Sequence, residues 1–172
     1  HELSIVAQSM EATLSEKDVI SEKVEQLLIS TRNAFYIGRG NDYYVTMEAA
    51  LKLKEISYIQ TEGFAAGELK HGTISLIEDN TPVIALISAD STIAAHTRGN
   101  IQEVVSRGAN ALIIVEEGLE REGDDIIVNK VHPFLSAISM VIPTQLIAYY
   151  ASLQRGLDVD KPRNLAKAVT VE

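Results

Sequence analysis

The sequence contains no cysteine and no tryptophan, and it has only four prolines. Without cysteine the chain has no disulfide, no thiolate zinc site and no cysteine nucleophile. This composition is typical of a cytoplasmic protein, which is the location we expect. Basic residues are also scarce, because 15 Lys and Arg stand against 24 Asp and Glu, for a net charge of −9. A nucleic-acid partner is therefore not expected, since a phosphate backbone requires a basic surface.

Long hydrophobic runs are missing as well. The longest mainly apolar stretch, Ala137–Ile142, is followed by Pro143 and Gln145. A helix that spans a bilayer needs about 20 apolar residues, so we expect no membrane association. The first residues, His1–Met10, do not have the basic and then apolar pattern of a signal peptide. Since the sequence does not begin with Met, we expect it to be a piece of a longer protein.

What the sequence does have is the composition of a globular domain. Apolar residues make up 46% of its 172 residues and charged residues 23%. A chain of this length can bury a substantial core, and its length favours one main domain.

Short apolar runs alternate with segments of helical periodicity. The predicted strands are Ala34–Ile37, Val83–Ile87, Ala111–Val115 and Ile126–Val128. The predicted helices are Leu3–Leu14, Ile20–Leu28 behind a capping box at Ser15–Asp18, Tyr43–Ile59, Ser91–Arg107 closed by Gly108, and Pro133–Leu153. Strands that are apolar throughout and separated by helices indicate a sheet covered on both faces. We predict an α/β fold, a three-layer doubly wound sheet that is mostly parallel, with four to five strands.

Such sheets bind ligands beyond the carboxyl ends of their strands, here Gly38–Asp42, Ser88–Ser91 and Glu116–Gly118. The Gly38-Arg39-Gly40 motif is compatible either with a phosphate cradle or with a tight turn that needs positive φ. It lacks the further glycine of a dinucleotide fingerprint. The acidic segment Glu116–Asp125 is predicted to be a solvated loop.

One predicted helix carries a polar stripe. Glu48, Lys52 and Glu55 are spaced four and three residues apart, which puts them on one helix face. The stripe is either a surface ion-pair ladder or a general base held ionised by an ammonium group.

Among the histidines, His71 lies between polar residues and next to Gly72, where it could either transfer a proton near neutral pH or stay solvated. His96 and His132 are predicted to be structural. No group of residues has the spacing of metal ligands, so we expect no metal and no cofactor.

The C-terminal segment combines apolar and basic residues. Arg163 and Lys167 are four residues apart after Pro162. The segment is compatible with a solvated basic tail, or with a packed cap whose lysine forms a Schiff base with a carbonyl substrate.

Three separated blocks resemble one family. EAALKLKEISYI at Glu48–Ile59, GELKHG at Gly67–Gly72 and DVDKPRNLAKAVTVE at Asp158–Glu172 are similar, in this order, to the end of the glucosamine-6-phosphate synthase family. The resemblance implies packing helices at 1–30, the second sugar-isomerase (SIS) subdomain at 31–157, and an active-site tail at 158–172. The glutaminase domain and the first SIS subdomain, which carries the family's phosphate-binding loop, would lie elsewhere in the same chain.

The resemblance also implies a reaction. The enzyme would convert fructose 6-phosphate and glutamine-derived ammonia into glucosamine 6-phosphate. Glu55 would move a proton between C1 and C2 of the open-chain sugar, and Lys167 would form a Schiff base with the ketose carbonyl. His71 would open the sugar ring in the neighbouring subunit's site, which implies a homodimer.

The remaining implied roles are supporting ones. Lys52 would stabilise charge on the enolamine, and Glu48 would hold Lys52. Arg163 and Ala166 would contact the sugar as the tail closes over it.

The sequence departs from the family pattern at Ala49, where glycine is usual, and at Thr73, where proline is usual. Neither change touches a proposed catalytic atom. Three alternatives remain: a fructosamine deglycase, which should lack the PRNLAK tail; a sugar-phosphate-sensing SIS module of a regulator; and a domain that only dimerises.

Overall fold

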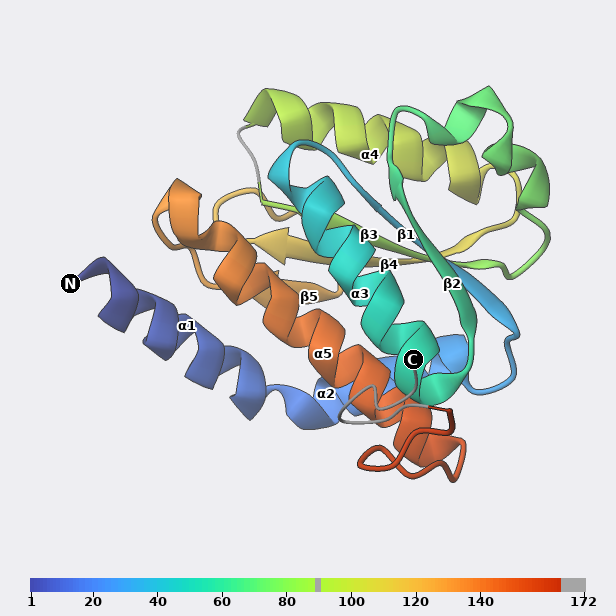
Figure 1. Ribbon diagram of the computed structural model, residues 1–172. Coiled ribbons are helices and arrows are strands. Elements are labelled where there is room, and N and C mark those ends of the chain that lie inside the picture. The colour runs from blue at the N-terminus through green and yellow to red at the C-terminus, as the bar shows by residue number, and fades with distance from the viewer. Residues whose placement is uncertain (89–90, 165–172) are drawn as a thin grey trace, which may run out of the picture.

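The computed structural model describes residues 1–88 and 91–164. In this part of the chain, helices alternate with strands (Figure 1). The α-helices are α1 (Glu2–Ser15), α2 (Lys17–Leu28), α3 (Asn41–Ser57), α4 (Ser91–Val105) and α5 (Ser136–Gln154). The strands are β1 (Asn33–Gly38), β2 (Gln60–Ala65), β3 (Pro82–Ile87), β4 (Asn110–Glu116) and β5 (Ile126–Val128). Short 3-10 helices are η1 (Leu69–His71), η2 (Thr73–Leu76) and η3 (Pro133–Leu135).

The strands form one sheet in the order β2-β1-β3-β4-β5, and every neighbouring pair is parallel. The chain runs from β1 outward to β2 and then crosses to β3 on the other side of β1. The topological switch point therefore lies between β1 and β3. This arrangement confirms the predicted α/β fold, with all of the pairings parallel rather than most of them.

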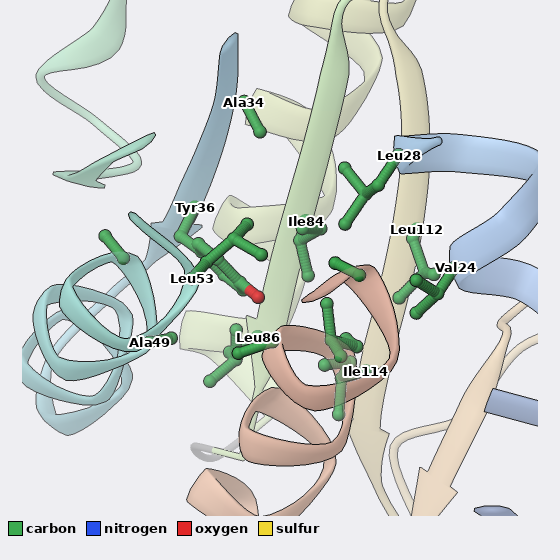
Figure 2. Packing of buried hydrophobic residues seen from close by; sticks show 14 of the residues in the cluster. Val24, Leu28, Ala34, Tyr36, Ala49, Leu53, Ile84, Leu86, Leu112 and Ile114 are labelled. Carbon is green, nitrogen blue, oxygen red and sulfur yellow. The ribbon is translucent and has the colours of Figure 1, made fainter. Parts of the chain in front are cut away.

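Helices cover both faces of the sheet, so that alternate residues of β1, β3 and β4 enter different cores. On one face, Tyr36, Ile84 and Ile114 pack with residues of α2, α3 and α5 (Figure 2). On the other face, Phe35 and Val83 join a second cluster with residues of α4 and of the segment that contains η1. The continuous apolar strands of the sequence are explained by this burial from both sides.

Strand β2 was not predicted. Its sequence, QTEGFA, is too polar to resemble a buried strand, and its burial is only partial. β2 lies at the edge of the sheet and pairs only with β1 among the described residues. Gly63 allows α3 to pack closely on this edge, since a Cβ there would lie 2.7 Å from the carbonyl oxygen of Thr46.

The predicted capping box at Ser15–Asp18 is wrong. α1 continues through Ser15, whose hydroxyl donates to the Glu11 carbonyl 3.0 Å away, and α2 has no side-chain cap. A serine inside a helix commonly donates to the carbonyl four residues earlier instead of capping. The turn after α4 agrees with the prediction, because Gly108 has a φ of +100°.

Within the described residues, Pro133–Gln154 is the one helical segment with the length and apolar composition to span a membrane. Core helices of soluble proteins have the same properties. α5 contacts α1, α2, α3, β4 and β5, and its buried apolar residues, such as Met140 and Ile147, belong to the core of this domain.

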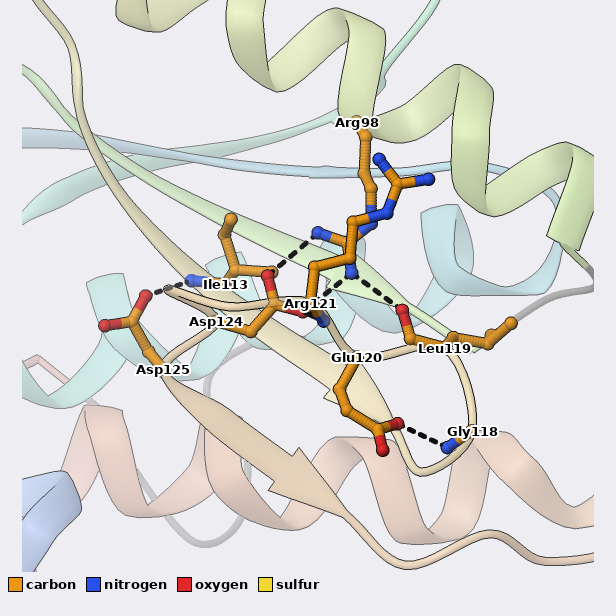
Figure 3. A network of polar contacts seen from close by, with 8 residues as sticks. All are labelled: Arg98, Ile113, Gly118, Leu119, Glu120, Arg121, Asp124 and Asp125. Atoms are coloured by element: carbon orange, nitrogen blue, oxygen red, sulfur yellow. Dashed lines mark hydrogen bonds and ion pairs between the residues drawn. The ribbon is translucent and has the colours of Figure 1, made fainter.

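The acidic segment after β4 is a loop that is exposed over most of its length, as its composition predicted, but two of its aspartates are held in place by specific contacts. The Arg98 guanidinium on α4 donates to both carboxylate oxygens of Asp124, at 2.8 and 2.6 Å, and to the Leu119 carbonyl at 2.8 Å (Figure 3). Asp125 accepts from the Ile113 backbone amide and from Lys23, each at 2.8 Å. The Asp124 side chain is 2% exposed. Two of the acidic residues therefore fasten the loop to the sheet and the helices.

Substituting Arg98→Ala is expected to lower the free energy of unfolding by about 3–5 kcal/mol, because it leaves the buried Asp124 carboxylate without its charge partner. Arg107→Ala, an exposed position after the same helix, is the matched control and should cost less than about 1 kcal/mol. Urea unfolding at pH 7 measures both values. Equal free energies of unfolding for the two variants would contradict a stabilising role of the Arg98–Asp124 ion pair.

This ion pair also predicts acid sensitivity. Burial alone raises the pKa of Asp124, but hydrogen bonds from Arg98 and the Arg121 amide, and the charges of both arginines, outweigh it and lower that pKa. The stabilisation is therefore present above the unfolded pKa of about 3.9 and is lost as the pH falls through the lower folded value. In urea titrations from pH 6 down to pH 3, wild type should lose more stability than Asp124→Asn. Equal losses of stability in wild type and Asp124→Asn would show that the Arg98–Asp124 ion pair is not the source of the acid sensitivity.

Candidate functional site

α3 positions the polar stripe predicted from the sequence. The helix starts after Gly40, whose φ is +58°, and ends at Tyr58, whose φ is +61°. Its buried side, which includes Ala49 and Leu53, faces the sheet and α5. A more exposed flank of the helix carries Glu48, Lys52 and Glu55, and their ion pairs confirm that these three side chains share one face.

Lys52 is the centre of this group. Its Nζ lies 2.9 Å from Glu55 Oε2 and 3.8 Å from Glu48 Oε1. The hydrogen bond to Glu55 is the main cause that raises the pKa of Lys52; partial burial opposes it, and the charges of Glu55 and Glu48 add to it. Lys52 therefore stays protonated, and its ammonium group donates a hydrogen bond to the Glu55 carboxylate. The Glu55 side chain is 28% exposed, which leaves it accessible to a ligand.

A cavity of about 540 Å³ adjoins Lys52. Its other walls come from α1, α3, α5 and the segment after α5, and they are mainly apolar. They include Leu14, Ile56, Tyr149 and Val159. Glu55 does not line this cavity. Lys52 is the residue of the polar stripe that does, so it contacts both the Glu55 carboxylate and the cavity between α3 and α5.

The beginning of the predicted tail folds back onto the end of α3. The backbone N–H of Arg163 donates to the Tyr58 hydroxyl at 2.8 Å, and the guanidinium carbon of Arg163 lies 4.1 Å from the Tyr58 ring centroid. Tyr58 follows Glu55 by less than one helical turn. Sequence reasoning missed Tyr58, since nothing in its neighbourhood indicated a long-range partner. Ala166 and Lys167 lie outside the described residues.

His71 is placed away from this group. It is exposed at the end of η1, and the segment around it packs through Ala66, Leu69 and Ile77 into the core shared with α4. Glu55 belongs to the helix that covers the opposite face of the sheet. One copy of the chain therefore does not bring His71 and Glu55 together.

The Gly38-Arg39-Gly40 motif makes a tight turn. Gly40 needs its positive φ, and a Cβ on Gly38 would lie 2.8 Å from the Asp42 backbone. The Arg39 guanidinium donates to the Asn100 side chain at 2.9 and 3.1 Å, and a Cβ on Gly67 would lie 2.7 Å from it. Arg39 thus supports the start of the segment that leads to His71.

The three strand ends named from the sequence meet as predicted. Residues after β1, β3 and β4 line one cavity of about 580 Å³ at the carboxyl edge of the sheet. In it Asp42 accepts hydrogen bonds from the backbone N–H of Ser88, at 2.8 Å, and from the Ser88 hydroxyl. Sequence reasoning identified this edge but gave no role to Asp42 or to Glu116 beside it.

The two remaining predicted histidines differ. The His132 Nδ1 accepts from the Phe134 amide at 3.3 Å and caps η3, so its structural role is confirmed. His96 is exposed on α4, which does not fit a structural role. In the described residues, no group of three or more His, Asp or Glu side chains could hold a metal ion.

Comparison with known proteins gives three results. The whole chain is 99% identical, over 172 residues, to a protein of Streptococcus agalactiae serotype V named glutamine–fructose-6-phosphate aminotransferase (isomerizing), and it spans 28% of that relative's length. The solved C-terminal domain of glucosamine-fructose-6-phosphate aminotransferase from Francisella tularensis is similar with a TM-score of 0.84 and 32% identity, over 93% of this chain and 46% of that one. Glucosamine-6-phosphate deaminase from Thermotoga maritima is similar with a TM-score of 0.70 and 25% identity, over 90% of this chain and 46% of that one.

The family model described as the SIS domain matches residues 27–155. This range contains the whole sheet, α3 with its polar stripe, and the segment of His71. The chain therefore belongs to the SIS domain family.

Proposed function

We propose that this chain is the C-terminal isomerase part of an enzyme that makes glucosamine 6-phosphate from fructose 6-phosphate and glutamine-derived ammonia. The relative that is 99% identical is named a glutamine–fructose-6-phosphate aminotransferase (isomerizing), which supports this proposal. The observation on this chain that carries the proposal is the contact of Lys52 with Glu55, 2.9 Å apart at the partly exposed end of α3. The glutaminase domain and the first SIS subdomain belong to the rest of the polypeptide, of which this chain covers 28% in that relative.

Glu55 acts as the base for the isomerisation. Once the C2 carbonyl has become an imine, a proton leaves C1 and an enolamine forms; return of a proton to C2 leaves an aldose with its amine on C2. One carboxylate that reaches both carbons can perform both transfers. Lys52 remains an ammonium group beside Glu55 and stabilises negative charge that develops on the sugar. Glu48 helps to hold Lys52 in this place.

The tail brings the second reactive group. Lys167 forms the Schiff base with the ketose carbonyl, releasing water, and ammonia then displaces the lysine. Arg163, four residues earlier, is held by Tyr58 next to the Glu55 end of α3. With Ala166 it contacts the sugar as the tail closes, which excludes water from the imine.

His71 opens the sugar ring in the site of a neighbouring subunit. Its position over the α4 face of the sheet, away from Glu55, supports a site shared between two copies. We therefore propose a homodimer, acting in the cytoplasm.

In the complete polypeptide, Glu55→Gln is expected to lower the interconversion of fructose 6-phosphate and glucose 6-phosphate by about 10²- to 10⁴-fold, because the base is lost while the shape is kept. Glu62→Gln, an exposed carboxylate on β2, is the control and should behave as wild type. A coupled assay of sugar phosphate turnover measures both variants. Full activity of Glu55→Gln would remove Glu55 from the chemistry, and an inactive wild type would favour a sugar-phosphate-sensing module.

Tyr58→Phe removes the hydroxyl that accepts from Arg163 but keeps the ring. Loss of one hydrogen bond should reduce kcat by about 3- to 10-fold with little change in KM, because the tail is held less often in its closed position. Trypsin should also cut after Arg163 faster than in wild type. Tyr44→Phe, at an exposed tyrosine of α3, is the control. An unchanged kcat and cleavage rate in Tyr58→Phe would exclude a role in holding the tail.

Shared sites predict complementation between two inactive variants. Co-expressed Glu55→Gln and His71→Ala chains form mixed dimers in which one of the two sites has both intact residues, so about a quarter of wild-type activity should return. Each variant alone should stay inactive. If mixing restores nothing although mixed dimers are isolated by differential tags, His71 acts within its own chain.

A further inference from the structure

The cavity at the carboxyl edge of the sheet is separate from the proposed isomerase site. Asp42 lies in the first turn of α3, whereas Glu55 lies 13 residues further along, about 20 Å at 1.5 Å per residue. The cavity is also located at the switch point between β1 and β3, where doubly wound folds bind ligands. Its volume of about 580 Å³ suits a small molecule.

The main feature of this cavity is a carboxylate without a partner. Glu116, the last residue of β4, is 6% exposed and lines the cavity. Within the described residues, its carboxylate makes no hydrogen bond and no ion pair, unlike Asp42, which holds Ser88. A buried carboxylate normally has donors, because its desolvation is otherwise uncompensated. The carboxylate oxygens of Glu116 are not among the fully enclosed unpaired atoms, so a ligand in the cavity can reach them and donate hydrogen bonds to them.

The charges around Glu116 favour a cation. Burial raises the pKa of Glu116 to about 7; Lys130 at the rim opposes this rise, and the Asp42 carboxylate adds to it. Above that pH the described lining residues of the cavity carry two carboxylates, Glu116 and Asp42, against the one ammonium group of Lys130. A phosphate group would meet both carboxylates, so this cavity is unsuited to the phosphate of a sugar phosphate.

The other residues that line the cavity indicate which further chemical groups the bound cation contains. Ser91 and Ser136 line the cavity at the starts of α4 and α5 and offer oxygen atoms to hydroxyl groups. Ile93, Leu119 and Pro133 provide apolar surface for a carbon skeleton. The cavity thus combines one strong site for an ammonium group with weaker sites for hydroxyl groups.

We propose that this cavity binds a small hydroxylated primary amine, whose ammonium group donates to Glu116. The site is distinct from the one that contains Glu55 and Lys52, and the amine bound there is not phosphorylated. Because Glu116 must be ionised, binding tightens as the pH rises from 6 to 7.

Isothermal titration of the complete polypeptide at pH 7 tests this site, with D-glucosamine as the probe and D-glucose as its uncharged match. Fructose 6-phosphate is added in excess to occupy the site near Glu55. Glucosamine should bind wild type, and Glu116→Gln should bind it at least about ten-fold more weakly, the loss expected for a charge-assisted hydrogen bond. Glucose should bind wild type as weakly as glucosamine binds Glu116→Gln. Glu122→Gln, at an exposed glutamate of the following loop, should match wild type.

Three results would overturn the proposal: absent glucosamine binding to wild type, equal binding to Glu116→Gln, or displacement of glucosamine by fructose 6-phosphate or inorganic phosphate. Thermal unfolding tests whether Glu116 has a structural role instead of a role in ligand binding. Removing a carboxylate that has no partner should leave the melting temperature of Glu116→Gln equal to or above that of wild type. A clear fall would mean that Glu116 stabilises the fold and would contradict the proposal. None of these measurements requires turnover, so they remain informative if the proposed isomerase activity fails.

Discussion

The packing of α3 against the sheet and against α5 beside it determines where the polar groups of this domain lie. Ala49, Ala50 and Leu53 are at most 2% exposed on the buried side of the helix. Because this side is fixed by close packing, the helix cannot rotate, and Lys52 and Glu55 are held toward the partly open side. The same constraint holds Asp42 over the carboxyl edge of the sheet. One buried helix face thus positions the proposed base at one end and the proposed amine site at the other.

The layered architecture has a consequence for assembly. A sheet covered on both faces separates what each covering layer presents, and here Glu55 and His71 belong to different layers. A reaction that needs both groups in one site must take them from two chains. The segment of His71 is held by Arg39 and by apolar contacts of Leu69, so it is presented outward on a supported loop.

Much of this could be predicted from the sequence, because burial from both sides gives strands such as Val83–Ile87 continuous apolar sequences, and helical spacing puts Lys52 and Glu55 on one face. Edge strand β2 could not be recognised, because a strand with one paired edge needs fewer apolar residues. The fastening of Asp124 by Arg98 and the contact of Tyr58 with Arg163 join residues 26 and 105 positions apart. Local pattern carries no information about such pairs. The surroundings of Glu116 depend on three strand ends and on the starts of α3, α4 and α5, which only the folded chain brings together.

The most direct test of the account is a structure of the complete polypeptide with fructose 6-phosphate bound. We expect the open-chain sugar at the Glu55 end of α3, with the Glu55 carboxylate within about 3.5 Å of C1 and C2 and His71 of a second copy near the oxygen that closes the ring. A sugar bound away from Glu55, or a site completed by His71 of the same chain, would contradict it.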